Sequence, residues 1–189
     1  MNTRDQVYES IGVGYAAARR PDPRIYQQII EALGDAQSVL NVGAGGGNYE
    51  PPDRRAAKRQ VILLFEPAES QKSWLVEYFP ECLALPSETG DPGVDDVGSV
   101  LDVQSVSPVP VPSDCTDGFA GAYWARPEAY LDPLVRAGIS SLALLAPVDA
   151  ERGAQRLRED LPSRVWDARF GYLRELPEFE LGYRLVVAG

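Results

Sequence analysis

Apolar residues recur along the chain with two spacings, and each spacing predicts one kind of element. Those within 25–33 repeat at helical spacing, so we expect a helix that begins near Pro23 and ends before Gly34. Residues 61–65 form a continuous apolar run, which suits a strand buried on both faces. Similar patterns predict further strands at 38–42, 103–109 and 181–188, and helices within 70–79, 94–101, 114–146 and 149–161.

Strands and helices alternate along the chain, and this order predicts the fold class. Alternation favours an α/β architecture with a mostly parallel sheet, here of about four strands flanked by helices. A chain of 189 residues suffices for one domain with a real core. We therefore expect a single domain over 1–189, with an N-terminal arm and glycine-loop half (1–60) and a C-terminal half (61–189).

Composition and charge exclude several classes of partner. The 18 basic and 28 acidic side chains give a net charge of −10, which argues against nucleic acid and anionic lipid. No apolar run is long enough to cross a bilayer, and residues 1–6 hold no apolar stretch of a signal peptide. We expect a cytoplasmic protein that binds neither membranes nor nucleic acid.

The residue types also restrict the chemistry. The chain has no histidine, which excludes Ser-His-Asp and Cys-His catalysis and most zinc sites. Its two cysteines, Cys82 and Cys115, share no metal-ligand spacing, so we expect no metal. Any general acid or base must therefore be an Asp, Glu, Tyr, Cys, Lys or Arg side chain.

A glycine-rich loop, residues 43–49, directly follows the predicted strand 38–42. Glycine allows a sharp backbone turn and lets a ligand approach without a Cβ in the way, so the pattern is typical of nucleotide-binding loops. The alternative is a tight turn between a strand and a helix.

The residues around this loop resemble a known family. Residues 14–25 and 38–51 are similar to the start of bacterial class I methyltransferases that use S-adenosylmethionine. In that family the loop cradles the cofactor, and an upstream Tyr and Arg lie near its methionine end. The resemblance therefore implies cofactor-binding roles for the matching residues Tyr15, Arg19, Asn41, Gly43, Gly45 and Gly47.

The C-terminal half resembles the same family, with one large departure. The similar runs are 110–119, 122–131, 157–161, 166–169 and 181–188. Full-length relatives place several strand–helix units between the glycine loop and the Asp-Cys-Thr-Asp-Gly segment, whereas here only 61–65 fills that interval. The resemblance implies a reduced Rossmann-like class I methyltransferase fold whose central strands are missing.

Residues 61–65 can be matched to that fold in two ways. As the family's fifth strand, they leave the second to fourth strands absent, together with the acidic residue that holds the ribose, and no cofactor is then expected. As the second strand, they place Glu66 on the ribose hydroxyls, and S-adenosylmethionine binding is retained. A solvent-exposed carboxylate at a strand end is the other interpretation of Glu66.

Two carboxylates, Asp114 and Asp117, follow a proline-rich strand exit and are our catalytic candidates. They could bind substrate as a pair, or one could act as a base with a raised pKa. The alternative for Asp114 is that it caps a helix beginning at Cys115. Without a histidine as base, Cys115 is a poor candidate for a nucleophile.

Four further residues are candidate substrate contacts. Tyr123 and Trp124 could line a pocket, although aromatic residues are more often core. Arg20 and Arg126, together with Arg19, could hold an anionic group such as a carboxylate or sulfate, and surface solvation is the alternative for at least one of them.

Three hypotheses about function follow. The first is a methyltransferase-like protein that has lost methyl transfer and serves in a biosynthetic complex of specialised metabolism, assisting an intramolecular substitution or ring closure, for example an aziridine-type ring formed as sulfate leaves. The second is a working minimal methyltransferase, and the third a structural or regulatory subunit. Missing central strands leave an open sheet edge, so we expect a protein partner, either a different subunit or a second copy.

Overall fold

A computed structural model describes residues 19–35, 59–66, 68–69, 73–85 and 92–189 of the chain. Within these residues the main sheet has three strands, β1 (Gln60–Phe65), β2 (Val103–Pro108) and β5 (Tyr183–Ala188). Three of the four predicted strands are thereby confirmed, and the fourth, 38–42, lies outside the described residues. A two-stranded sheet joins β3 (Val111–Pro112) to β4 (Glu178–Phe179).

The prediction of a mostly parallel sheet is wrong. The strand order is β1-β5-β2, and the central strand β5 is antiparallel to both neighbours. Phe65 at the end of β1 pairs with Tyr183 at the start of β5. β5 therefore begins at the end of the sheet where β1 finishes, and it runs in the opposite direction. The two outer strands, β1 and β2, point the same way, but β5 separates them.

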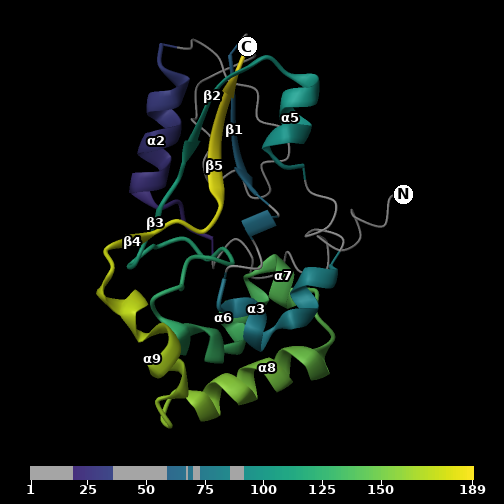
Figure 1. Cartoon of the computed structure of the whole chain (residues 1–189), viewed down its shortest axis with the longest axis vertical. Coiled ribbons are helices and arrows are strands. Elements are labelled where there is room, and N and C mark those ends of the chain that lie inside the picture. Colours follow the sequence, from purple (N-terminus) through teal and green to yellow (C-terminus); the bar gives the residue numbers. More distant parts are fainter. Residues whose placement is uncertain (1–18, 36–58, 67, 70–72, 86–91) are drawn as a thin grey trace.

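Two helices cover opposite faces of the sheet, α2 (Pro23–Leu33) and α5 (Val94–Val100). Figure 1 shows the sheet nearly edge-on between them. Leu64 and Val186 pack with Val97 of α5. Val61 lies three positions before Leu64, and because side chains alternate along a strand it faces the other side, where α2 contacts β1. The continuous apolar run of β1 is therefore explained by a helix on each face.

The helix α2 begins and ends as its sequence predicts. The Asp22 carboxylate accepts a hydrogen bond from the Arg24 N–H, Pro23 opens the helix, and Gly34 follows its end with φ 57°. A side chain rarely adopts that φ, so glycine is the residue expected there.

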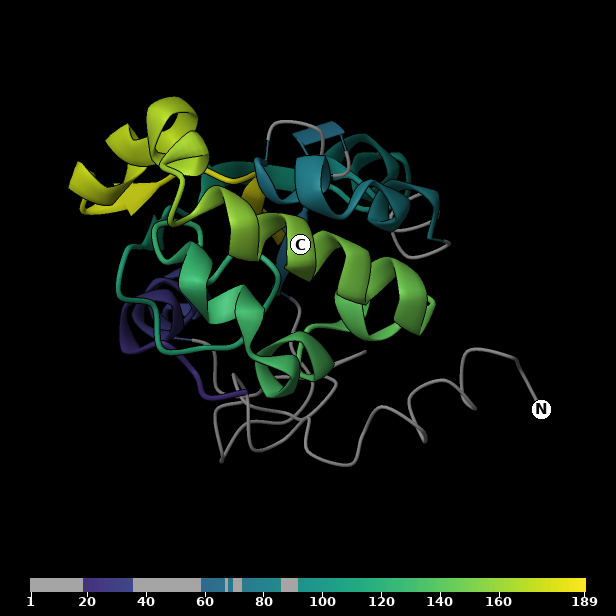
Figure 2. The ribbon, with the colours of Figure 1, turned by 90° about the horizontal axis from the view of Figure 1, so that it is seen from below.

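A layer of short helices lies at one end of the sheet (Figure 1). Seen from below, α8 runs across this layer, with α9 near one of its ends (Figure 2). The predicted helix at 149–161 is confirmed as α8, whereas 114–126 holds no helix. The elements of the layer are α3 (Leu75–Tyr78), η2 (Pro80–Ala84), η3 (Pro127–Leu131), α6 (Pro133–Ala137), α7 (Ser140–Ala143), α8 (Pro147–Asp160), α9 (Val165–Phe170) and η4 (Gly171–Glu175).

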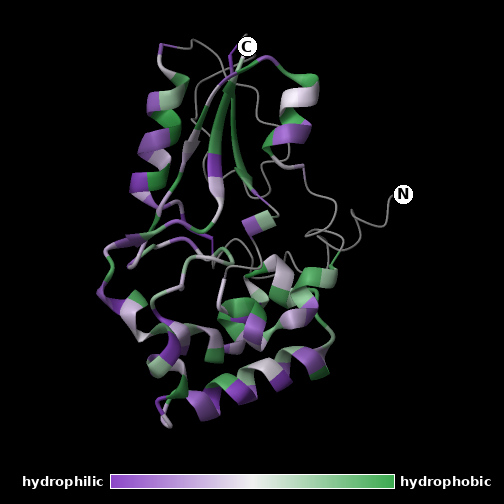
Figure 3. Cartoon of the chain, viewed as in Figure 1, coloured by the Kyte–Doolittle hydropathy of each residue, from purple (hydrophilic) through white to green (hydrophobic). Residues whose placement is uncertain are grey.

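Aromatic side chains form the core of this layer. Trp74 makes edge-to-face contacts with Tyr130 and Trp166, each at 5.4 Å between ring centroids. The buried Trp74 indole N–H donates to the backbone oxygen of Trp124 at 2.9 Å. Hydropathy alternates along α8, whose buried residues Gly153, Ala154 and Leu157 share its inner face (Figure 3).

Candidate functional site

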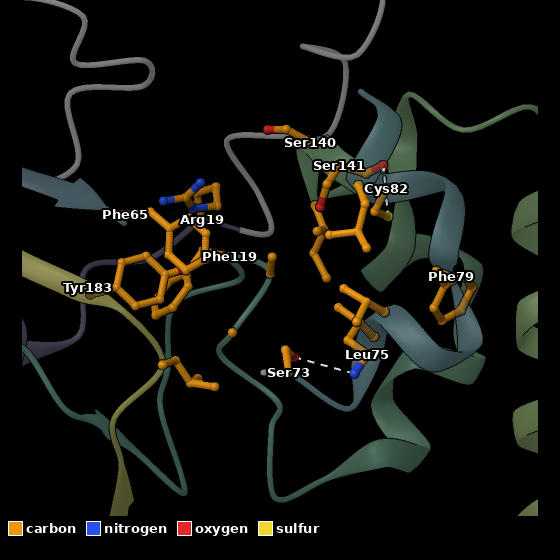
Figure 4. A pocket seen from close by; sticks show the side chains of 16 residues that line it. Arg19, Phe65, Ser73, Leu75, Phe79, Cys82, Phe119, Ser140, Ser141 and Tyr183 are labelled. Carbon is orange, nitrogen blue, oxygen red and sulfur yellow. Dashed lines mark hydrogen bonds between the residues drawn. The ribbon is translucent and has the colours of Figure 1, made fainter. Parts of the chain in front are cut away.

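A cavity of about 240 Å³ lies between the sheet and the helical layer. On one side the rings of Phe65, Phe119 and Tyr183 lie together beside Arg19, and residues of α3, η2 and α7 form the opposite side (Figure 4). Most of the lining is apolar. The described lining residues are Arg19, Phe65, Ser73, Leu75, Val76, Phe79, Cys82, Leu83, Phe119, Ala120, Gly121, Ile139, Ser140, Ser141, Leu181 and Tyr183.

The aromatic wall comes from three elements that the fold brings together. Phe65 ends β1, Tyr183 begins β5, and Phe119 lies in the loop after β3. The Tyr183 ring contacts Phe65 at 5.2 Å and Phe119 at 4.9 Å between centroids. Because the two strand ends meet in register, the wall follows from the antiparallel pairing of β1 with β5.

Arg19 is the charged side chain among the described lining residues, and it is held by Asp117. Its Nε donates to Asp117 Oδ1 at 2.7 Å and its Nη2 to Oδ2 at 3.2 Å. The Asp117 side chain is completely buried, whereas that of Arg19 is 20% exposed. Asp117 also accepts the Gly118 N–H at 2.7 Å, so its position is set by the loop as well as by Arg19.

A second cluster of charged groups holds the neighbouring loop. Arg24 bonds the buried Asp22 through Nη2 at 2.8 Å and the exposed Asp114 through Nη1 at 2.6 Å. Asp22 also accepts the Thr116 N–H at 3.1 Å. The Arg24 guanidinium and the Thr116 N–H hold the pKa of Asp22 far below its usual value. The cluster thus ties the start of α2 to the 114–116 loop.

The two catalytic candidates have different surroundings. Asp114 is exposed, and its hydrogen bond from Arg24 lowers its pKa, which is the opposite of what a raised-pKa base requires. It caps no helix, because none begins at Cys115. Asp117 is buried and bonded to Arg19, which lines the cavity. The structure therefore associates Asp117, rather than Asp114, with the cavity.

Cys115 is buried next to these carboxylates. Burial raises the pKa of its thiol to about 12, so the thiol is protonated at neutral pH. A protonated, buried thiol is a weak nucleophile, as expected from the absence of histidine.

The candidate substrate contacts Tyr123, Trp124 and Arg126 lie outside the described lining of the cavity. Trp124 is 2% exposed, and its indole N–H donates to the Val111 oxygen at 3.0 Å. Arg126 donates to the backbone oxygens of Cys115 and Ala122 and lies 4.9 Å from the centre of the Tyr123 ring. These contacts hold the loop and the core together.

The Glu66 carboxylate accepts a hydrogen bond from the first residue of α5. Its Oε2 accepts the Val94 N–H at 3.1 Å, and its Oε1 lies 2.7 Å from where a Cβ on Gly93 would be. Its own N–H donates to Gly182 at 2.8 Å. Glu66 is therefore a side chain that caps α5, an interpretation that its sequence position alone does not suggest.

Five predicted cofactor residues, Tyr15, Asn41, Gly43, Gly45 and Gly47, lie outside the described residues. Arg20 is described and exposed.

Sequence reasoning missed Asp22 and the aromatic wall. An aspartate before a proline that opens a helix is a recognisable cap signal, and could have indicated Asp22. Nothing local indicates that Phe65, Phe119 and Tyr183 meet. Within the described part of the chain, no three acidic or cysteine side chains are grouped to hold a metal, and no helix is long and apolar enough to span a membrane.

Comparison with known proteins supports the fold. No protein-family model matches the chain, and no curated protein matches it in sequence. Its structure is similar to a 2.40 Å crystal structure of a protein from Anabaena variabilis, which is provisionally described as a methyltransferase from an antibiotic biosynthesis pathway. The TM-score is 0.78 and the sequence identity is 24%, and the match covers 91% of this chain and 99% of the other. This chain therefore has a methyltransferase-like fold, and it shares that fold with a chain of similar size.

Proposed function

We propose that this chain is a methyltransferase-like protein of specialised metabolism that binds a small molecule in the cavity, has lost methyl transfer, and works as a subunit of a biosynthetic complex. The observation that carries the loss of methyl transfer is the position of Glu66. The fold supports the first part of the proposal, since the similar structure belongs to a protein described as part of an antibiotic pathway.

Glu66 is the acid that the methyltransferase hypothesis needs for the ribose. Its carboxylate instead accepts a hydrogen bond from the Val94 N–H and lies against Gly93. Turning it to a ribose would leave that N–H, in the first turn of α5, without its acceptor. This use of Glu66 supports the absence of a ribose site at the end of β1.

The size of the cavity supports a small ligand. Pockets for drug-sized ligands span roughly 300–1,000 Å³, and this one has about 240 Å³. Such a volume is small for the whole of S-adenosylmethionine. Apolar walls that hold one small molecule in a single conformation favour an intramolecular substitution, because positioning and exclusion of water are the main requirements of that reaction. Closure of an aziridine-type ring as sulfate leaves is one reaction of this class.

Isothermal titration calorimetry of the full chain with S-adenosylmethionine and with its demethylated product tests the loss of methyl transfer. We expect no heat of binding at micromolar to millimolar ligand. Micromolar binding that is lost in Glu66→Ala but kept in Glu175→Ala, an exposed acid of the helical layer, would contradict the proposal and support a minimal methyltransferase.

Size-exclusion chromatography with light scattering tests the subunit role. The chain expressed alone should form a dimer or larger species, or show a broad thermal transition, since it lacks its partner. A monodisperse 20.6 kDa monomer with a sharp transition would contradict the subunit role and leave the calorimetric result unaffected.

A further inference from the structure

We propose that the cavity binds an aromatic ring that carries one neutral hydrogen-bonding substituent, with the ring against the aromatic wall and the substituent at the Ser141 hydroxyl. This inference rests on the proposed function, because it names the class of molecule, or part of a molecule, that the same cavity binds. It follows from the aromatic wall, from a buried hydroxyl on the opposite side and from the size of the cavity.

The aromatic wall offers ring faces and edges to a ligand. The rings of Phe65, Phe119 and Tyr183 lie together on one side of the cavity (Figure 4). The plane of the Tyr183 ring makes an angle of 55° with that of Phe65 and of 71° with that of Phe119. Rings at different angles allow a further ring to pack in offset-stacked or edge-to-face geometry. An aliphatic ring lacks the quadrupole for these contacts, so the wall favours an aromatic ligand.

Gly121 allows the wall to pack closely. A Cβ there would lie 2.8 Å from Leu181 Cδ1, 3.2 Å from Tyr183 Cε2 and 3.4 Å from Phe119 Cε2. All three of these residues line the cavity. The missing side chain at position 121 therefore lets two of the rings approach each other, and together they form one continuous binding surface.

A buried hydroxyl lies on the opposite side of the cavity. Ser141 of α7 lines that side (Figure 4), and the residue is only 8% exposed. Its backbone oxygen accepts the Cys82 thiol at 3.6 Å, whereas its hydroxyl makes no hydrogen bond within the described part of the chain. A buried hydroxyl without a partner costs free energy. Because Ser141 lines the cavity, a group on the ligand can supply the missing bond.

The surroundings of Ser141 favour a neutral group there. A serine hydroxyl both donates and accepts, so it matches a phenolic hydroxyl. The described lining residues from α3, η2 and α7 carry no charge, and Arg19, on the side of the aromatic wall, is bonded by both Asp117 oxygens. A charged substituent at Ser141 would therefore lose hydration without an opposite charge beside it among these residues.

The volume limits the ligand to one ring. An engineered apolar cavity of about 150 Å³ in another protein binds benzene. A volume of about 240 Å³ therefore accommodates a benzene ring with one or two small substituents.

The test measures the affinity of the full chain for four probes of similar size by ligand-observed NMR titration at neutral pH. They are p-cresol, toluene without the hydroxyl, 4-methylcyclohexanol without the aromatic ring, and 4-methylbenzoate with an anion in place of the hydroxyl. We expect p-cresol to bind at least about threefold more tightly than each of the others, which is the effect of one neutral hydrogen bond or one aromatic contact. Equal or tighter binding of any other probe, or no binding of p-cresol at millimolar concentration, would overturn the proposal.

Variants separate the hydroxyl from the wall. Ser141→Ala should reduce the p-cresol-to-toluene affinity ratio to about one and leave the p-cresol-to-4-methylcyclohexanol ratio unchanged, because both of the latter probes carry a hydroxyl. Phe119→Leu should reduce the second ratio and leave the first unchanged. Ser107→Ala, at an exposed position of β2 outside the described lining, should change neither. Each ratio compares two ligands on the same protein, so partial unfolding of a variant does not alter it.

Two results would refute the assignment of Ser141: an unchanged first ratio in Ser141→Ala, or a reduced first ratio in Ser140→Ala, the neighbouring lining serine. These results are independent of the calorimetric test. Binding of S-adenosylmethionine would contradict the loss of methyl transfer and leave the order of the four probes unaffected, whereas a different order would overturn the present inference alone.

Discussion

Gly153 of α8 lies against Tyr78 and Phe79 at the end of α3, and its replacement by alanine has two opposing effects. A Cβ at this position would lie 2.5 Å from Cδ1 and Cε1 of Phe79 and from the backbone oxygen of Tyr78. Alanine is favoured over glycine inside a helix by about 1 kcal/mol. Overpacking a core costs typically about 1–3 kcal/mol.

We expect the steric cost to exceed the helix preference. The Phe79 ring is completely buried, and the Tyr78 oxygen belongs to the backbone, so neither can move away easily. Taking the upper end of the overpacking range, Gly153→Ala should lower the free energy of unfolding by about 2 kcal/mol. In a domain of this size that corresponds to a fall of roughly 4–8 °C in melting temperature.

Gly98→Ala is the matched control. Gly98 also lies within a helix, α5, but nothing lies within 4 Å of where its Cβ would be. Only the helix preference then acts, so we expect stabilisation by about 0.5–1 kcal/mol. Thermal and urea unfolding followed by circular dichroism would measure both variants. A Gly153→Ala protein that melts at or above the parent temperature, or two variants that shift in the same direction, would refute this explanation.

Three further predictions concern titratable side chains. The pKa of Asp22 is lowered in the folded state, so its stabilising effect is present above about pH 4 and is lost as the pH falls further. In urea unfolding, Asp22→Ala should lower the free energy of unfolding by about 2 kcal/mol at pH 7 and by less at pH 3. Asp114→Ala should change it little. The raised pKa of Cys115 predicts that iodoacetamide at pH 8 modifies it only after unfolding, and rapid modification of the folded chain, seen by mass spectrometry, would contradict its burial. Tyr78 donates to Asp160 at 2.9 Å and its pKa is raised by burial, so its contribution is full below about pH 10 and is lost above it. Tyr78→Phe should therefore flatten the fall in stability between pH 9 and 11, and an unchanged alkaline profile would contradict this.

The local elements could be predicted because their signals are local. The helical spacing of Ile25 and Leu33, with Pro23 before it and Gly34 after it, is enough to place α2. A continuous apolar run placed β1, and a charged amphipathic pattern placed α8 within two residues at its start. Each of these patterns depends on the repeat of a helix or strand, which neighbouring residues determine.

The direction of the strands could not be predicted in this way. Alternating elements favour parallel strands, yet β5 lies between β1 and β2 and is antiparallel to both. Strand direction depends on which end of the sheet the chain enters. That in turn depends on where the preceding helical layer ends, which no single segment specifies.

By itself, the sequence indicated the helices α2, α5 and α8, the three strands of the main sheet, the lack of histidine chemistry and the acidic charge. Only the tertiary structure decided which candidate residues meet. Arg19 and Asp117 are 98 residues apart, and they form a pair because the 113–118 loop folds back beside the start of α2. Trp124 lies in the core and Glu66 caps α5 for the same reason. The contacts of each side chain are made with residues from distant segments, and these contacts cannot be predicted from the local sequence pattern.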